Sequence, residues 1–142
     1  MRGKPHILAA LLALALALLL SGCAGGDTVE RFAPAAPSDG ASIAVPGYET
    51  IPLTAGEKAQ AVYFTNPPEN ACTFVLSLTL DDTGETLWKG DALSPGEAFT
   101  RVTLKRALTA GEYAATLRYD CFSLQDGAPL NGAEIKVTLS VT

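Results

Sequence analysis

The side chains that most often perform acid–base and zinc chemistry are scarce in this sequence. The single histidine, His6, lies directly before an apolar run over 7–20, in an N-terminal segment that has the features of an export signal. Once that segment is removed, no imidazole remains to act as a general base near neutral pH or as a zinc ligand. Catalytic arrangements of the Ser-His-Asp and Cys-His types are then excluded. The sequence also has no glycine-rich phosphate loop.

Carboxylates are the remaining groups that could bind a metal or catalyse a reaction. Asp81, Asp82 and Glu85 crowd one short stretch, and Ca²⁺ takes about six to eight oxygen ligands of this kind. Their spacing is not that of an EF-hand, so we interpret the stretch as a solvated acidic turn. A glycosidase needs two carboxylates about 5–10 Å apart in a cleft, for which a small domain with short loops has little room. We therefore expect no enzymatic activity, no metal site and no cofactor.

The first cysteine, Cys23, ends a segment with the features of an export signal. Arg2 and Lys4 supply positive charge, and an unbroken run of Ile, Leu and Ala covers 7–20. This run is shorter than the roughly 20 apolar residues of a transmembrane helix, and it suits a secretory signal. The run leads into LSGC at 20–23, which resembles the lipobox of bacterial lipoproteins. An ordinary secretory signal that is cleaved nearby is the alternative.

The lipobox resemblance implies that residues 1–22 are removed and that the Cys23 sulfur carries a diacylglyceryl group. Acyl chains then hold the protein at the extracytoplasmic face of the cell membrane without spanning it. Arg2 and Lys4 are two of ten basic residues, so eight remain beside fifteen acidic ones after Cys23. This negative excess disfavours nucleic acid as a partner. No basic patch for acidic lipid is predicted either, so we expect the acyl chains alone to provide anchoring.

Residues 23–42 differ in composition from the rest of the chain. This segment consists mainly of small residues, proline and charged residues, with only Val29 and Phe32 as sizeable apolar groups. Such a sequence buries too little surface to offset the entropy lost on ordering. We therefore predict that residues 23–42 are the lipidated cysteine and a flexible tether spanning roughly 25 Å, followed by one domain over 43–142.

The domain over 43–142 is predicted to be all-β. Apolar residues alternate with others over 73–80, 113–120 and 135–141, which is the pattern of half-buried strands. Weaker strands are expected near 49–53, 59–66, 86–89 and 98–104. About seven short strands in roughly 100 residues predict a single immunoglobulin-like antiparallel β-sandwich.

A short motif recurs between the predicted strands. LTAGE occurs at 53–57 and at 108–112, and LSPGE occurs at 93–97. The spacings share no period, so the copies do not form a repeat array. A small residue or proline followed by glycine suits a type II turn, and we interpret all three copies as turns rather than as a ligand motif. DDTGE at 81–85 is predicted to close a hairpin.

Two further cysteines, Cys72 and Cys121, lie within the predicted domain. By alternation, Cys72 shares a face with Phe74 and Cys121 shares a face with Tyr119, so both thiols are expected to point into the core. An exported location favours a disulfide between them, but spacing along the chain does not show that they meet. Two buried free thiols are the alternative.

The domain also resembles a small exported module of Gram-positive bacteria, often the C-terminal domain of surface or lipoprotein-like products. The resemblance is carried by NPPENAC at 66–72, YDCFSL at 119–124 and LNGAEIKVTL at 130–139. It covers nearly all of the predicted domain. It implies the sandwich fold and assigns no activity.

Binding to a partner is the function class that these exclusions leave. The candidate contact residues are aromatic side chains near strand ends and a rigid polar loop, namely Trp88, Tyr48, Phe122, Asn66 and Asn70. The segment 124–132 is predicted to be the longest loop, and loops often carry binding. We expect a non-catalytic adaptor whose partner is another surface protein. Binding of carbohydrate or cell-wall glycan is the alternative, and it requires Trp88 or the tyrosines to be exposed.

Overall fold

The computed structural model describes residues 26–37 and 42–142 as a set of strands. Within these two ranges, no helix is long and apolar enough to cross a membrane. The seven strands expected within 43–142 are all present, and one further strand precedes them. In chain order, the strands are β1 (Thr28–Arg31), β2 (Thr50–Leu53), β3 (Ala59–Thr65), β4 (Cys72–Leu80), β5 (Thr86–Lys89), β6 (Glu97–Thr103), β7 (Gly111–Ser123) and β8 (Pro129–Val141).

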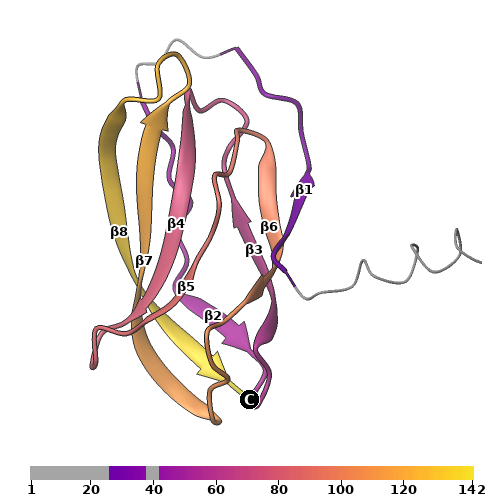
Figure 1. Cartoon of the computed structure of the whole chain (residues 1–142), viewed down its shortest axis with the longest axis vertical. Coiled ribbons are helices and arrows are strands. Elements are labelled where there is room, and N and C mark those ends of the chain that lie inside the picture. Colours follow the sequence, from indigo (N-terminus) through magenta and orange to yellow (C-terminus); the bar gives the residue numbers. More distant parts are fainter. Residues whose placement is uncertain (1–25, 38–41) are drawn as a thin grey trace, which may run out of the picture.

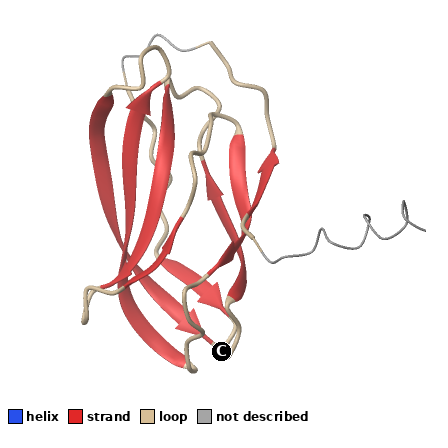
Figure 2. Cartoon of the chain, in the orientation of Figure 1, coloured by secondary structure: helices blue, strands red, loops and turns tan. Residues whose placement is uncertain are grey.

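The strands form two sheets that pack against each other as a β-sandwich (Figures 1 and 2). The smaller sheet has the order β1-β6-β3, and the larger sheet has the order β2-β8-β7-β4-β5. The prediction of an all-β sandwich is therefore confirmed. The expectation of purely antiparallel pairing is wrong at one place, because β2 pairs in parallel with β8. The chain descends from the hairpin end of the sandwich into β2, and β8 descends in the same direction (Figure 1).

Strand β1 corrects the prediction of a flexible tether over 23–42. Thr28–Arg31 pair antiparallel with β6 and form an edge of the smaller sheet. All four residues of β1 are exposed, so apolar burial contributes little to holding this strand in place. Sequence composition could not reveal it, because backbone pairing and polar contacts hold it instead.

The two ends of β1 are fixed by specific hydrogen bonds. Before the strand, the Asp27 carboxylate accepts from the Trp88 indole Nε1 at 2.7 Å and from the Thr103 amide at 2.8 Å. We call these two bonds the Asp27 clamp. After the strand, the Phe32 amide donates to the Gly96 carbonyl at 2.9 Å. Because Trp88 lies on β5 and Thr103 on β6, the Asp27 clamp ties the N-terminal segment to both sheets.

The apolar faces of the two sheets meet in one core. Strand β4 alternates strictly between buried and half-buried residues, as its sequence predicts. In the core, the Trp88 ring packs between Phe64 and Phe99, with ring centroids 5.7 and 5.0 Å away. Burial of this apolar surface is the main favourable term in folding. The largest fully buried side chains are Tyr119, Phe64, Phe74, Phe99, Leu76, Leu78, Leu87, Leu93, Leu104, Leu108, Leu117 and Leu139.

Two of the three LTAGE-like motifs form the predicted turns. Gly56 and Gly96 have φ angles of 74° and 83°, in the left-handed region where glycine is favoured. A Cβ on Gly96 would also lie 2.0 Å from the Ala33 carbonyl oxygen, so this glycine permits the close approach of the segment after β1. The third copy differs, because Gly111 is already the first residue of β7. The predicted hairpin at 81–85 is confirmed by the antiparallel pairing of β4 and β5.

The connection between β7 and β8 is shorter than the loop predicted over 124–132. Strand β8 already begins at Pro129, which pairs with Phe122, and Leu130 pairs with Cys121. The glycine and proline in this stretch suggested a loop throughout. The register shifts between Tyr119 and Cys121, and this irregularity lets Gly132 approach the Tyr119 carbonyl closely.

Candidate functional site

A groove of about 860 Å³ lies at the end of the sandwich that carries the β7–β8 hairpin. Three parts of the chain line it: the segments on either side of 38–41, the turn before β4, and the hairpin itself. Leu124 and Leu130 line it while 52% and 42% exposed. Concave sites with a mostly apolar lining and a few polar groups are typical of binding sites. This groove is therefore the candidate site.

Asn66 organises the chain beneath the groove rather than contacting a partner. Its side chain is 0% exposed. Its Nδ2 donates to the carbonyls of Cys72 and Leu93, each at 2.9 Å. Its Oδ1 accepts from Asn70 Nδ2 at 2.9 Å. The expectation that Asn66 contacts a ligand is wrong, because every one of these polar atoms is used within the fold.

Asn70 joins the wall of the groove to the turn before β4. Its Oδ1 accepts from the Ala44 amide and its Nδ2 donates to the Ala44 carbonyl, both at 2.8 Å. The amide side chain thus pairs with Ala44 as a neighbouring strand would. With 2% of Asn70 exposed, this residue positions the groove lining and is not free to grip a partner.

Trp88 is buried, which removes it as a sugar-stacking residue. It is 2% exposed, and its indole N–H is taken by the Asp27 clamp. A tryptophan in a β-sandwich lies in the core more often than at the surface, and Trp88 follows this tendency. The binding role considered for Trp88 is therefore wrong.

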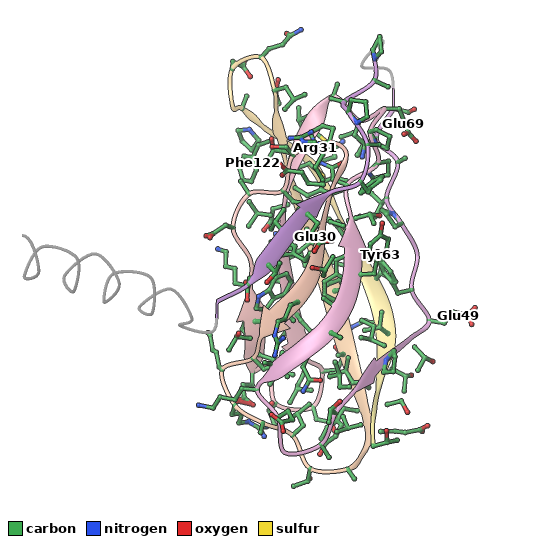
Figure 3. The ribbon with its side chains drawn as sticks, turned by 90° about the vertical axis from the view of Figure 1, so that its right-hand side faces the viewer. Glu30, Arg31, Glu49, Tyr63, Glu69 and Phe122 are labelled. Atoms are coloured by element: carbon green, nitrogen blue, oxygen red, sulfur yellow. The ribbon has the colours of Figure 1, made fainter. Side chains whose placement is uncertain are left out.

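The other aromatic candidates lie apart from one another. Tyr48 is half-buried, and its hydroxyl donates to the Tyr63 carbonyl at 2.9 Å. Phe122 is half-buried on β7 near the hairpin end, well away from Tyr63 (Figure 3). Tyr63, another aromatic residue that the sequence places near a strand end, is exposed and forms a pair with Phe32 that could not be predicted from the sequence. The two residues are 56% and 44% exposed, with ring centroids 6.4 Å apart. The isolated phenylalanine in the polar segment 23–42 was a signal for one ring of this pair but did not indicate the other.

The predicted disulfide is not formed, because Cys72 and Cys121 are both free and buried. In the β4–β7 register, Cys121 pairs with Phe74 and Cys72 pairs with Ser123, so the two cysteines are diagonal neighbours. Diagonal positions lie about 7–8 Å apart, beyond the usual Cα separation of about 4.4–6.8 Å in a disulfide. The expectation that both thiols point into the core is confirmed.

Burial keeps these thiols and a neighbouring phenol protonated. Burial, followed by the charge and hydrogen bond of Cys121, raises the pKa of Cys72 to about 11. Burial also raises the pKa of Cys121. The pKa of Tyr119 is raised by burial and then by the nearby Tyr48. The arrangement therefore yields unreactive thiols rather than nucleophiles.

These raised pKa values predict that the fold weakens at alkaline pH. The unfolded chain loses its thiol protons near pH 9 while folded Cys72 keeps its proton until about pH 11. The stabilisation is fully present below pH 9 and is lost as the pH rises through 11. We expect the urea midpoint to fall steadily between pH 9 and 11. Urea titrations of the protein and of its Cys72→Ala and Tyr119→Phe variants will show shallower slopes in the variants. A midpoint that is constant across this range would contradict the prediction.

The acidic turn at 81–85 is held by protein donors. Thr116 Oγ1 donates to Asp81 at 2.6 Å, and Lys136 Nζ lies 3.2 Å from the same carboxylate. Arg106 makes a bidentate pair with Glu85, with a shortest distance of 2.8 Å. Hydrogen bonds from Thr116 and Arg106, respectively, lower the pKa values of the Asp81 and Glu85 carboxyls. Among the described residues, no group of three metal-ligating side chains is positioned to hold a metal ion.

Comparisons of this chain with known proteins provide no relative from which a function could be assigned, so the β-sandwich and its groove are the basis for the proposal below. A scan against protein-family models, a search of curated proteins and a search of solved structures each found no match. The predicted signal segment 1–22 and the predicted lipidation site at Cys23 lie outside the described residues.

Proposed function

We propose that this chain is a lipid-anchored extracytoplasmic protein, acylated at Cys23, whose β-sandwich binds another protein. The lipobox-like LSGC at 20–23 and the apolar run before it support the anchor. The groove at the hairpin end supports the binding role. It has room for part of a partner, and it presents Leu124 and Leu130 to solvent. We assign no catalytic residue. The carboxylates of Asp81 and Glu85 in the acidic turn already accept hydrogen bonds from Thr116, Lys136 and Arg106.

The exposure of Leu124 and Leu130 is the observation on which the protein-binding proposal rests. Folded domains bury most large aliphatic side chains, and apolar side chains gathered at a concave surface are typical of interaction sites. The surrounding lining includes small residues such as Ala35, Ala36 and Ala133. Such a surface would accept the side chains of an extended or irregular segment of a partner protein.

A photocrosslinking experiment in the producing cells tests this function. A photoreactive amino acid is placed at Leu124, and in a matched variant it is placed at Asp82, which is exposed in the turn at the other end of β4. We expect a defined crosslinked protein from position 124 and none from position 82. Loss of membrane association in a Cys23→Ser variant tests the anchor separately. Equal crosslinking from both positions would contradict a groove-specific partner.

Glycan binding remains a second proposal because of the exposed Phe32–Tyr63 pair. Its two rings are tilted by 52° to each other, and both side chains are partly open to solvent. Exposed aromatic rings stack on sugars as well as on protein groups. In the same crosslinking experiment, recovery of wall fragments in place of a protein would favour this alternative, and Phe32→Ala and Tyr63→Ala would then be expected to reduce that recovery.

A further inference from the structure

We propose that the partner of this chain adds an antiparallel β-strand to a free edge of β8, beside the groove. The inference rests on the proposed function, and it specifies the chemistry of the partner. The added segment of the partner is extended, with apolar side chains at every second position and basic residues among the positions between them. We call residues 133–137 of β8 the β8 edge.

Strand β8 has a neighbouring strand along one whole side but along only part of the other. Strand β7 pairs with it from the hairpin to its C-terminal end, whereas β2 pairs only with residues 138–141. The chain bends at Glu49, just before β2, and the Tyr48 ring packs against Phe64 of the smaller sheet with centroids 5.5 Å apart. The segment before β2 therefore turns from β8 towards the smaller sheet. Figure 1 shows the upper part of β8 at the left-hand border of the molecule, with no described strand on its outer side.

The backbone groups of Glu134 and Lys136 point to this unpaired side. The Thr138 amide donates to the Glu49 carbonyl at 2.9 Å, so Thr138 points towards the side on which β2 lies. Backbone groups alternate in direction along a regular strand, and the register of β7 with β8 is regular from residue 133 to residue 141. Glu134 and Lys136 therefore point the same way as Thr138. Within residues 26–37 and 42–142, neither of their amides donates to a backbone carbonyl outside the β7–β8 ladder, so both are available to a partner strand.

The side chains that could shield the β8 edge are held away from it. Edge strands are commonly protected by charged side chains, proline or bulges. Lys136 Nζ donates to Thr116 Oγ1 at 2.8 Å and lies 3.2 Å from the Asp81 carboxylate, and Glu134 lies 3.5 Å from Arg118. Both charged side chains are thus directed over β7. The proline and the irregular register of β8 lie nearer the hairpin, outside the β8 edge.

The groove is continuous with the β8 edge, and it sets the apolar half of the partner's chemistry. Ala133 lines the groove together with Leu130, and Ile43 and Val45 line it from the segment before β2. Ile135 shares a face of β8 with Ala133, and both pack against the core while remaining half-buried. An added strand would direct every second side chain to this face. Apolar side chains at those positions would be removed from water on binding.

Charged side chains around the β8 edge are mainly acidic, and they set the other half of the partner's chemistry. Side chains on the outer face of an added strand would lie opposite Glu134 and near Asp120, so basic residues there would be attracted. The next charged pair, Arg31 with Glu97, belongs to the smaller sheet and is neutral as a pair. Six carboxylates stand against two cations here: Glu49, Glu69, Asp81, Asp120, Asp126 and Glu134 against Arg118 and Lys136.

The antiparallel direction determines which atoms of the added strand would meet β8. Antiparallel pairs are slightly more stable than parallel ones, and in them two directly opposite residues exchange both of their backbone hydrogen bonds. The residues opposite Glu134 and Lys136 would therefore turn their N–H and C=O groups towards β8. These same residues carry the side chains of the outer face, whereas the residues between them carry the apolar side chains.

Hydrogen exchange at single amides tests whether the edge is free in the protein alone. The full protein is purified in detergent, and exchange is followed for residues 134–137. We expect the amides of Glu134 and Lys136 to exchange at least about 100-fold faster than those of Ile135 and Val137, which point to β7. Equal protection of all four amides would overturn the inference, because it would mean that the edge is already covered.

A synthetic peptide, acetyl-VTVKVK-amide, serves as the probe strand. In the antiparallel register its threonine lies opposite Lys136, its first lysine lies opposite Glu134, and its valines face the groove side. Binding of a labelled copy is measured by fluorescence anisotropy. We expect N-methylation of the threonine and the first lysine, whose amides face β8, to weaken binding at least about tenfold. N-methylation of the second and third valines, whose amides face away, should have little effect.

The same peptide gives the results that would contradict strand addition. No binding of the parent peptide, or equal binding of the two methylated peptides, would overturn it. A peptide with glutamate in place of both lysines should bind at least about threefold more weakly. Equal binding of that peptide would overturn the assignment of basic residues to the partner.

A matched pair of protein variants connects the peptide result with the partner in the cell. Glu134→Pro removes the amide donor that faces the edge, and proline is tolerated where the N–H points away from the sheet. Glu134→Ala removes the same charge and keeps the amide, so the difference between the variants isolates the hydrogen bond. We expect Glu134→Pro to bind the peptide at least about fivefold more weakly than Glu134→Ala and to lose more of the protein crosslinked from position 124. Urea unfolding establishes that both variants fold.

The outcomes separate this inference from the proposed function. If peptide binding and crosslinking are the same in Glu134→Pro and Glu134→Ala, strand addition is wrong while a groove partner still stands. If the peptide binds as expected but no protein is crosslinked in cells, the proposed function is wrong while the binding chemistry of the edge stands. If Glu134→Pro does not fold, the methylated peptides decide the question with the unchanged protein.

Discussion

Replacing Asp27 with alanine is expected to lower the free energy of unfolding by about 2–4 kcal/mol. The substitution removes two hydrogen bonds. The bond from the Trp88 indole is part-buried and worth about 1.5–3 kcal/mol, whereas the bond from the Thr103 amide is exposed and worth less, about 0.5–1 kcal/mol. It also leaves the indole N–H of Trp88 without its partner in a side chain that is only 2% exposed. Since small domains have a total stability of about 5–15 kcal/mol, this loss is a large fraction of the whole.

Chemical denaturation measures the global effect of Asp27→Ala, and amide hydrogen exchange measures the local one. The Thr103 amide, which donates to Asp27, should exchange faster, as should the amides of β1. Glu30→Ala is the matched control, because Glu30 is an exposed carboxylate on β1, the strand that Asp27 directly precedes (Figure 3). We expect the control to change stability by less than about 0.5 kcal/mol. Similar losses in the two variants would show that the Asp27 clamp has no special role.

The Asn66→Ala variant is expected to be destabilised by about 3–5 kcal/mol, the largest effect that we predict. The substitution leaves the Cys72 and Leu93 carbonyls without the donor that now serves both. It also frees one donor of Asn70 and opens a cavity in a fully buried site. Unsatisfied buried polar groups each cost about 1–3 kcal/mol, so the contributions accumulate.

Asn131→Ala provides a control of the same residue type, because Asn131 is exposed beside the groove. Thermal and urea unfolding of both variants should show a large shift for Asn66→Ala and almost none for Asn131→Ala. Asn66→Asp keeps the size of the side chain but replaces the donor with a second acceptor. We expect it to be at least as unstable as Asn66→Ala at neutral pH. A stable Asn66→Asp protein would be incompatible with the donor role of Nδ2.

Strands that bury one face could be predicted from the sequence, because their apolar residues occur at every second position. The alternation over 73–80, 113–120 and 135–141 corresponds to β4, β7 and β8. Strand β1 shows no such alternation, because all four of its residues are exposed. It is held in place by backbone pairing with β6 and by the Asp27 clamp. Composition therefore assigned β1 to a tether.

The candidate site was harder to predict than the fold. The groove combines segments that are far apart in the sequence, and only tertiary structure brings Ala36, Asn70 and Leu130 together. The polar motif NPPEN suggested a contact loop, yet Asn66 and Asn70 are polar because they satisfy buried backbone groups. Both cysteines point into the core, as predicted, but they do not form the predicted disulfide. Whether two cysteines can bond depends on the register between β4 and β7, and the alternation of apolar residues does not reveal that register.

The direction of β1 has a mechanical consequence for an anchored protein. The strand runs from Asp27 towards the hairpin end of the sandwich, where the groove lies (Figure 1). If the proposed lipid anchor and groove partner are both present, a pull between them would act along β1, at right angles to its hydrogen bonds with β6. Those bonds are then loaded together in shear rather than opened one after another. The strand with the least buried surface is thus placed where tension is shared among all of its bonds.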